Sequence, residues 1–318
     1  MQSTVAVIIP FFQRERGILQ RALRSVQLQQ PHRVAQIIVV DDNSPVPARE
    51  ELDRLDEALR SRVVVLERPN GGPGAARNTG LDNVAPEVEY VAFLDSDDEW
   101  SDDHLSRALY ALDCGFDLYF ADSVEGNEVV GHFETDCRAL FERFAIFDPE
   151  HELYVFPGLL FDEILSKSII ATPTVVYRYR TLSDIRFRTD FRIGEDRFFW
   201  LSLLARTNRV VCTNRIALRI GKGVNVYRSA GWGDRELLSV LREQIRMRRS
   251  ISDSFALNAA QSEKNFLALR GHLKTFFANA AHRIVRGDLQ ALFASFALLA
   301  EYPGLLRVFA RKAFTSEH

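Results

Sequence analysis

Residues 90–100, with the sequence YVAFLDSDDEW, join a short apolar run to an acidic one. The apolar run at 90–94 is typical of a strand that is buried on both faces. Three carboxylates follow within four positions, at Asp95, Asp97 and Asp98. Carboxylates crowded in this way repel one another, so we expect them to be kept for a chemical purpose. The strand would deliver them to the edge of a sheet.

The sequence before this stretch alternates short apolar runs with amphipathic ones. Apolar runs at 5–10, 36–40 and 63–66 predict further buried strands. Apolar residues at helical spacing between 18 and 26, and a polar-faced segment at 46–60, predict the intervening helices. Strands that alternate with helices indicate βαβ units, and hence an α/β protein with a mostly parallel sheet.

The composition is that of an ordinary soluble globular protein. The chain has 318 residues, of which 47% are apolar and 26% charged, and its formal net charge is −3. These values exclude a collagen, a disordered tail and a disulfide scaffold. Three scattered cysteines without a CxxC pair predict a reducing, cytoplasmic compartment. We expect no signal peptide, and the most apolar later run, 291–300, is too short to span a bilayer.

The pattern is less regular after residue 100. It predicts strands at 117–122 and 169–179, a buried helix at 195–205, and a flexible loop with four glycines at 221–233. From residue 234 on, the pattern is helical, with breaks near Gly287 and Pro303. We therefore expect one domain at 1–233, whose pattern changes at about residue 100, followed by a helical region at 234–318.

The helical region is more basic than the rest of the chain. It carries 13 Lys and Arg against 8 Asp and Glu, whereas the first 233 residues are acidic on balance. A basic tail is suited to a membrane surface or an anionic partner, but a solvated arginine face explains it as well.

Four polar clusters follow predicted strands or open a helix, and ligands of open parallel sheets bind outside the carboxyl ends of the strands. Residues 41–44 (DDNS) would bind a nucleotide or form an Asx turn. Residues 70–78 (NGGPGAARN) would bring backbone N–H groups to a phosphate or make a tight turn, and they match neither a Walker loop nor a dinucleotide fingerprint. In the turn, Arg77 is placed to hold a diphosphate or to stack on a base.

The other two clusters are acidic. Residues 95–99 suit a divalent cation that bridges a nucleotide diphosphate, because Mg²⁺ or Mn²⁺ takes one or two carboxylates together with phosphate oxygens. The alternative is an acidic helix start, which the helix dipole favours. Residues 194–196 (GED) begin the helix at 195–205, where a carboxylate is either a general base or a simple N-cap.

Taken together, these clusters resemble the inverting nucleotide-sugar glycosyltransferases of family 2, which have the GT-A fold. The resemblance covers about residues 4–205 and rests on matches at 5–29, 37–44, 70–81, 90–100 and 191–203. Further segments, at 156–165, 171–180 and 221–233, resemble exopolysaccharide glucosyltransferases of the succinoglycan type. The resemblance implies a UDP-sugar donor, a divalent cation, Mg²⁺ or Mn²⁺, and a saccharide acceptor that is lipid-linked. It also implies that 1–233 is the catalytic domain, with a nucleotide-binding half of about 1–100 and an acceptor half of about 101–233.

The resemblance also assigns roles to residues. It implies the following assignments: Pro10, Asp41 and Asp42 at the uridine; Arg77 at the nucleotide; Asp95 and Ser96 at the ribose or uridine; Asp97 as the metal ligand; and Asp196 as the base, with Glu195 as its fallback.

Two departures from the family pattern affect the interpretation. Some relatives supply a histidine after the base helix, but this chain has none between His151 and His272. The loop at 221–233 would close the site instead, through Asn225, Tyr227, Arg228 or Trp232. Processive synthases carry Gln-x-x-Arg-Trp, whereas Gln244 here precedes Ile-Arg-Met, so transfer of a single sugar is expected.

Two other functions stay open. A sugar nucleotidyltransferase would use a similar metal site, but it normally has a glycine-rich loop directly after the first strand, and here the first glycine is Gly17. A non-catalytic nucleotide-sugar-binding protein would not need the full set of Asp95, Asp97 and Asp196. No nucleic-acid partner is expected. The apolar positions of 289–313 would pack on the protein, on a second subunit in a homodimer, or on the inner face of the plasma membrane.

Overall fold

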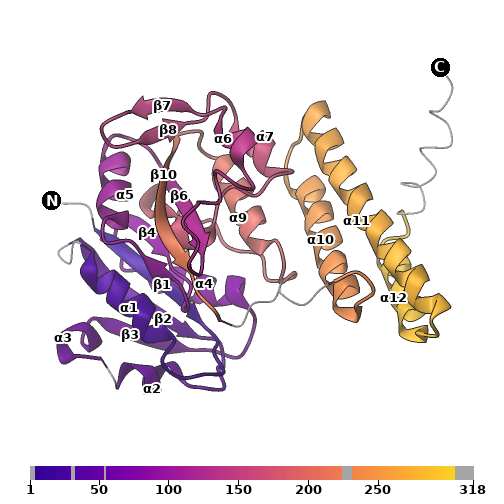
Figure 1. Cartoon of the computed structure of the whole chain (residues 1–318), viewed down its shortest axis with the longest axis horizontal. Coiled ribbons are helices and arrows are strands. Elements are labelled where there is room, and N and C mark those ends of the chain that lie inside the picture. The colour runs from indigo at the N-terminus through magenta and orange to yellow at the C-terminus, as the bar shows by residue number, and fades with distance from the viewer. Residues whose placement is uncertain (1–3, 30–32, 54, 224–230, 305–318) are drawn as a thin grey trace. The chain divides into compact units, whose positions relative to one another are not determined.

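A computed structural model of the chain describes residues 4–29, 33–53, 55–223 and 231–304. The chain divides into two compact units, residues 1–225 and 226–318 (Figure 1). Each is described by itself below. The domain boundary expected after residue 233 stays a prediction.

The first half of unit 1 is a parallel sheet in the order β3-β2-β1-β4. Its strands are β1 (Val5–Phe11), β2 (Val34–Asp41), β3 (Val63–Glu67) and β4 (Tyr90–Phe93). Every residue of β1 is buried, as the apolar run predicts. Phe11 pairs with Asp41, and Asp41 pairs with Glu67, so the carboxyl ends of these three strands coincide. The connecting helices are α1 (Leu19–Leu28), α2 (Ala48–Leu52), α3 (Glu57–Arg60) and α4 (Pro73–Leu81).

The second half continues the same sheet in the order β4-β9-β6-β10-β8-β7, and β5 pairs with β10. The short strand β9 (Val176–Arg178) is antiparallel to both β4 and β6 (Leu118–Glu125), and β10 (Val210–Ile220) is parallel to β6. The other strands are β5 (Glu99–Trp100), β7 (Ala145–Asp148) and β8 (Leu153–Val155). The helices are α5 (His104–Asp113), α6 (Arg138–Phe141), α7 (Leu160–Ile164), the 3₁₀ turn η1 (Thr172–Thr174), α8 (Tyr179–Leu182) and α9 (Glu195–Leu204). This mixed sheet with flanking helices confirms the predicted α/β class.

A cluster of aromatic side chains fixes α9 against the sheet. The rings of Phe187 and Phe199 stack with centroids 3.9 Å apart, and Phe93 of β4 meets both rings edge-on. Trp200 packs on Phe199 at 5.1 Å. Because aromatic side chains bury large apolar areas, this cluster sets the position of the first turn of α9 relative to the end of β4.

Two of the predicted elements of unit 1 differ from the structure, and strand β10 was not predicted. The segment 46–60 is two short helices, because the carboxylate of Asp56 accepts a hydrogen bond from Leu59 N and starts a new helix there. The segment 169–179 contains only the strand β9, since Pro173 lies in the 3₁₀ turn. Strand β10 was missed because its polar residues around Asn214 interrupt the apolar pattern, and the pairing with β6 is irregular there.

Unit 2 consists of the helices α10 (Arg235–Ser254), α11 (Ala259–Val285) and α12 (Leu289–Glu301). Leu241, Ile245, Leu273 and Phe276 are among the residues of its own apolar core. The expected continuous helix breaks at Asn258, whose side chain forms a capping box with Gln261. These helices confirm the predicted C-terminal helical extension, and none of the described helices is long and apolar enough to cross a membrane.

Candidate active site

The predicted polar clusters lie at the carboxyl ends of β2 and β4 and at the starts of α4 and α9. Pro10 lies within β1, opposite Val40 of β2, and its side chain is buried. Asp41 ends β2, and the turn that contains Asn70 and Gly71 comes soon after β3. The strand ends therefore gather these residues at one edge of the sheet.

The two aspartates after β2 have different partners. Asp41 accepts hydrogen bonds from Ser44 N through Oδ1 and from Ala48 N through Oδ2, each at 2.7 Å. Its carboxylate therefore organises the loop into α2, as an Asx turn would. Asp42 instead turns toward the loop that follows β3. Of the two, only Asp42 contacts another of the predicted clusters.

The carboxylate of Asp42 holds the glycine-rich turn. Its Oδ2 accepts hydrogen bonds from Gly72 N at 2.7 Å and from Gly71 N at 3.1 Å, and Arg68 Nη1 donates to its Oδ1 at 2.5 Å. Gly72 has φ +88°, a conformation that favours glycine. A Cβ at Gly74 would lie 2.9 Å from Glu195 Cγ, so glycine there lets α4 begin directly against α9.

Arg77 joins two of the clusters. Its side chain is buried, Nη2 donates to Asp95 Oδ1 at 2.7 Å, and Nη1 lies 3.5 Å from Glu195 Oε1. The guanidinium also lies over the ring of Phe187, 5.4 Å from its centroid. Burial acts to lower the pKa of Arg77, but Asp95 and Glu195 outweigh it and raise the pKa. Arg77 therefore stays charged. It holds the acidic loop that follows β4, residues 95–98, against the first turn of α9.

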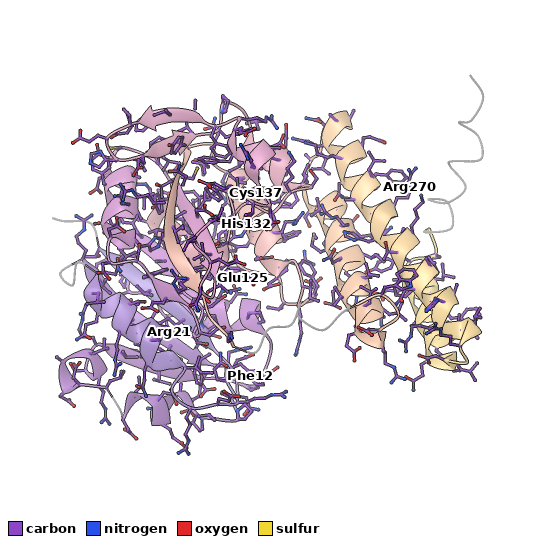
Figure 2. The ribbon with its side chains drawn as sticks, viewed as in Figure 1. Phe12, Arg21, Glu125, His132, Cys137 and Arg270 are labelled. Atoms are coloured by element: carbon purple, nitrogen blue, oxygen red, sulfur yellow. The ribbon has the colours of Figure 1, made fainter. Side chains whose placement is uncertain are left out.

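The acidic loop after β4 is tied to its neighbours through every residue from 96 to 98. Ser96 Oγ accepts a hydrogen bond from Gln13 Nε2 at 3.0 Å. The backbone oxygen of Asp97 accepts from Arg21 of α1 (Figure 2). Asp98 Oδ1 accepts from Gly221 N at 2.9 Å, at the end of β10.

Burial and mutual repulsion raise the pKa values of Asp97 and Asp98. Burial, with Asp95 adding to it, raises the pKa of Asp97, and burial with Asp95 and Asp97 raises that of Asp98 to about 8. A divalent cation would relieve this repulsion. Among the described residues, no group of three His, Cys, Asp or Glu side chains is arranged to hold a metal. However, Mg²⁺ bound with a nucleotide needs only one or two protein carboxylates, so Asp97 fits the role expected of it.

The two carboxylates at the start of α9, Glu195 and Asp196, lie in different surroundings. Gly194, at φ +86°, precedes the helix. Glu195 is buried against Arg77, and burial, with Asp196 beside it, raises the pKa of Glu195 although Arg77 opposes the shift. Asp196 is half-buried, and its Oδ1 accepts a hydrogen bond from Arg197 N at 2.6 Å. Asp196 is therefore the more accessible of the two to an acceptor hydroxyl.

The predicted closing loop is only partly described. Asn225, Tyr227 and Arg228 lie outside the described residues. Trp232 belongs to unit 2, is 59% exposed, and lies with its ring 5.9 Å from that of His282 on α11. None of these four side chains is placed at the site by the structure, and their role stays a prediction.

Several residues of this edge were missed from the sequence. They are Gln13, Arg21 and Arg68. Asp98 was named only as a member of the acidic cluster, and Gly221 and Gly223 only as part of the closing loop. A Cβ at Gly221 would overlap the backbone oxygen of Asp97, and one at Gly223 would overlap its carboxylate. The sequence predicted a flexible loop here that closes the site, and the structure shows that its first two glycines let the chain pass directly over the acidic loop.

Solved structures with this arrangement are GT-A glycosyltransferases. The chain superposes on S. aureus TarS 1–349 in complex with UDP-GlcNAc with a TM-score of 0.62 at 20% identity, over 96% of this chain and 83% of that one. It superposes on the mannosyltransferase PcManGT of Pyrobaculum calidifontis with a TM-score of 0.58 at 17% identity, over 100% and 89%. These similarities confirm the GT-A fold.

The sequence comparisons define the family. The chain belongs to glycosyl transferase family 2, whose profile matches residues 6–163. It is 34% identical to the succinoglycan biosynthesis protein ExoW of Rhizobium meliloti over 71% of each chain. It is 28% identical to an uncharacterized glycosyltransferase of Rickettsia felis, where the match covers 70% of this chain but only 34% of that longer protein.

Proposed function

We propose that this chain is a metal-dependent, inverting hexosyltransferase that transfers one sugar from a UDP-sugar, with glucose favoured, to a saccharide acceptor in the synthesis of a cell-surface polysaccharide. The family supports glycosyl transfer, and the ExoW relative is named for succinoglycan biosynthesis. A UDP donor is supported by the TarS complexes with UDP and UDP-GlcNAc, although PcManGT was solved with GDP-Man and Mn²⁺.

One observation carries the proposal. Arg77 contacts both Asp95 and Glu195, so a single guanidinium joins the acidic loop to the first turn of α9, which carries the proposed base. A donor held at the acidic loop would therefore have its sugar near the start of α9. This is the placement that a direct displacement requires, because acceptor and donor must meet in one orientation.

We assign a separate role in this displacement to each residue of the site. Asp42 and the glycine-rich turn that it organises would face the nucleoside, and Asp97 would hold the divalent cation, which supplies charge neutralisation to the leaving diphosphate. Asp196 would accept the proton of the attacking hydroxyl. With Asp196 as the base and no carboxylate among the described residues assigned as a nucleophile, the reaction would invert the anomeric centre, by the same logic that separates inverting from retaining hydrolases.

The acceptor and the place of action belong to the same proposal. We infer a lipid-linked saccharide at the inner face of the plasma membrane, reached from the cytoplasm. On α12 the side chains of Leu289, Phe293 and Phe296 are exposed, the last two at 70% and 62%. An exposed apolar helix face of this kind suits the boundary of a lipid layer. Alternatively, this apolar face of α12 would pack against the same face of a second copy of the chain. Two basic residues of the same region, Arg311 and Lys312, would support attachment to an anionic surface, but they lie outside the described residues.

The experiment is a UDP-release assay with the purified full-length chain, in which a disaccharide such as cellobiose is supplied as the acceptor and water accepts the sugar in its absence. UDP-glucose, UDP-galactose and UDP-GlcNAc are supplied separately with Mn²⁺ or with EDTA, and released UDP is measured. We expect release with one donor that depends on the metal. No release from any UDP-sugar would contradict the proposed donor class, and release of inorganic pyrophosphate from UTP with a sugar 1-phosphate would identify a nucleotidyltransferase instead.

A further inference from the structure

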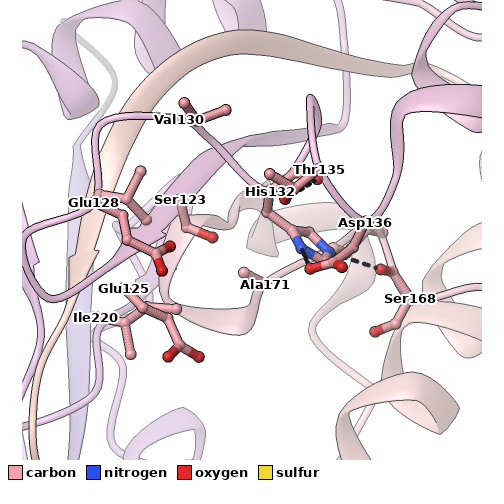
Figure 3. Close-up of a pocket in the computed structure, with 12 residues that line it drawn as sticks. Ser123, Glu125, Glu128, Val130, His132, Thr135, Asp136, Ser168, Ala171 and Ile220 are labelled. Atoms are coloured by element: carbon pink, nitrogen blue, oxygen red, sulfur yellow. Dashed lines mark hydrogen bonds and ion pairs between the residues drawn. The ribbon is translucent and has the colours of Figure 1, made fainter.

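A separate cavity of about 390 Å³ lies at the ends of β6 and β10 (Figure 3). Ser123 and Glu125 of β6 and Ile220 of β10 form one side, and His132, Asp136 and Ser168 form another (Figures 2 and 3). The volume lies within the range of about 300–1,000 Å³ that is usual for small-molecule sites. None of the residues discussed for the nucleotide or the base lines it.

Strand β10 connects this cavity to the acidic loop. Ile220 lines the cavity, and the next residue, Gly221, donates its N–H to Asp98. The opposite wall is tied to the same region, because Trp100 Nε1 of β5 donates to the backbone oxygen of Pro173 at 2.6 Å, two residues after Ala171 of the wall. Only one step along the chain, from Ile220 to Gly221, therefore separates the cavity lining from the contact with the acidic loop, which is predicted to hold the donor.

The wall at 131–137 is fixed before any ligand arrives. The buried carboxylate of Asp122 accepts hydrogen bonds from Ser123 N and from Phe133 N, and His132 N donates to the backbone oxygen of Ser123 at 2.9 Å. The His132 ring is held at Nδ1 by Asp136 Oδ2 at 3.0 Å, and at Nε2 by Cys137 Sγ and by Ser168 O at 3.1 and 3.2 Å. A wall fixed by this many contacts is preorganised for binding.

The groups inside the cavity define the ligand chemistry. Ser123 is 4% exposed, and among the described residues its hydroxyl has no hydrogen-bond partner. Figure 3 shows this hydroxyl directed into the cavity, with the carboxylates of Glu125 and Glu128 on the same side. Val130, Ile170 and Ala171 add apolar surface. Hydroxyl and carboxylate oxygens beside apolar patches suit a ligand with many hydroxyl groups and C–H faces, and the acidic side disfavours an anionic one.

We propose that this cavity binds the acceptor, a neutral saccharide, through hydrogen bonds from its hydroxyl groups to Ser123 and Glu128. This assignment rests on the proposed glycosyl transfer, and it names the class of acceptor that this transfer would use. A uronic acid or a sugar phosphate bound there would face Glu125, Glu128 and Asp136.

The test measures binding of neutral disaccharides to the full-length chain by saturation-transfer NMR. Cellobiose, laminaribiose, gentiobiose and lactose are the probes, and cellobiuronic acid is the charged counterpart of the first. Glu128→Gln and Ser123→Ala remove one cavity group each, and Glu134→Gln is the control, because Glu134 is exposed on the same 131–137 segment and does not line the cavity.

We expect at least one neutral disaccharide to bind, and its Kd to rise about tenfold or more in Glu128→Gln, the loss expected for a hydrogen bond to a charged group. Ser123→Ala should weaken binding less, and Glu134→Gln should not change it. The charged disaccharide should bind more weakly than cellobiose. The proposal is overturned if no neutral disaccharide binds the wild type, if binding is unchanged in both cavity variants, or if the charged form binds as tightly.

UDP binding with Mn²⁺, measured by calorimetry on the same variants, separates this proposal from the proposed function. It should stay at the wild-type value in all three, which also shows that they are folded. Failure of every UDP-sugar in the transfer assay would contradict glycosyl transfer, whereas normal UDP release with unaltered disaccharide affinity in Glu128→Gln would contradict only the acceptor site.

Discussion

Replacement of Arg77 by methionine tests the packing of the site most stringently. Methionine keeps much of the volume but removes the charge, so Asp95 loses a partner at 2.7 Å and the buried Glu195 loses one at 3.5 Å. The stacking on Phe187 is lost as well. Breaking a buried ion pair by removing one partner costs about 3–5 kcal/mol. Because the side chain of Asp95 is 34% exposed, we expect a loss of about 3 kcal/mol, at the low end of that range.

Hydrogen exchange of the β1 amides measures this loss of unfolding free energy within unit 1. Strand β1 is wholly buried, so its amides exchange through the largest openings of the unit. A loss of about 3 kcal/mol should speed their exchange roughly a hundredfold, since each 1.4 kcal/mol is a factor of ten. Arg206→Met is the control, because the Arg206–Asp184 pair is more than half exposed on both sides, and such pairs contribute about 0–1 kcal/mol. Equal effects of the two substitutions would refute the reasoning.

Three further predictions concern the metal, pH and the membrane. Asp97→Asn should abolish the gain in UDP affinity that Mn²⁺ gives in calorimetry, and an unchanged gain would remove Asp97 from the metal site. The hydrogen bond of His132 with Cys137, with Ser168 and Asp136 adding to it, raises the pKa of His132 from 6.5 to about 9. The stability that this provides, about 1 kcal/mol after solvent screening, should be complete below pH 6.5 and disappear as the pH rises through about 9. The difference in unfolding free energy between wild type and His132→Gln measures it, and a difference that is flat from pH 6 to 10 would contradict it. Finally, Phe293→Ser with Phe296→Ser should reduce flotation with anionic liposomes at least tenfold, from the lost burial of two aromatic side chains; if neither protein floats, α12 packs on protein.

The sequence predicted the parts of the site that depend on local pattern. The apolar runs of β1, β2 and β4 are continuous, so their carboxyl ends and the polar residues after them could be located without the structure. The start of α9 was found in the same way, because Gly194 precedes two carboxylates and an apolar helix.

The residues that were missed depend on contacts between distant segments. Gly221 reaches Asp98 across 123 positions, and Gln13 reaches Ser96 across 83, so no local pattern marks either contact. Strand β10, which carries Gly221 to the acidic loop, was itself hidden by its polar middle. The wall of the proposed acceptor cavity at 131–137 has no regular periodicity, and the buried carboxylate of Asp122 holds it in place.

The choice of base follows from the different surroundings of Glu195 and Asp196. Glu195 is buried and faces Arg77, whereas Asp196 is half-buried at the first turn of α9. Turnover of the preferred UDP-sugar by Asp196→Asn, compared with Glu195→Gln, is the most direct test of the account. Asp196→Asn should lower turnover by about 10²–10⁴-fold, the usual contribution of a general base, and leave UDP affinity unchanged. A severe loss in Glu195→Gln together with a mild one in Asp196→Asn would contradict the proposed mechanism.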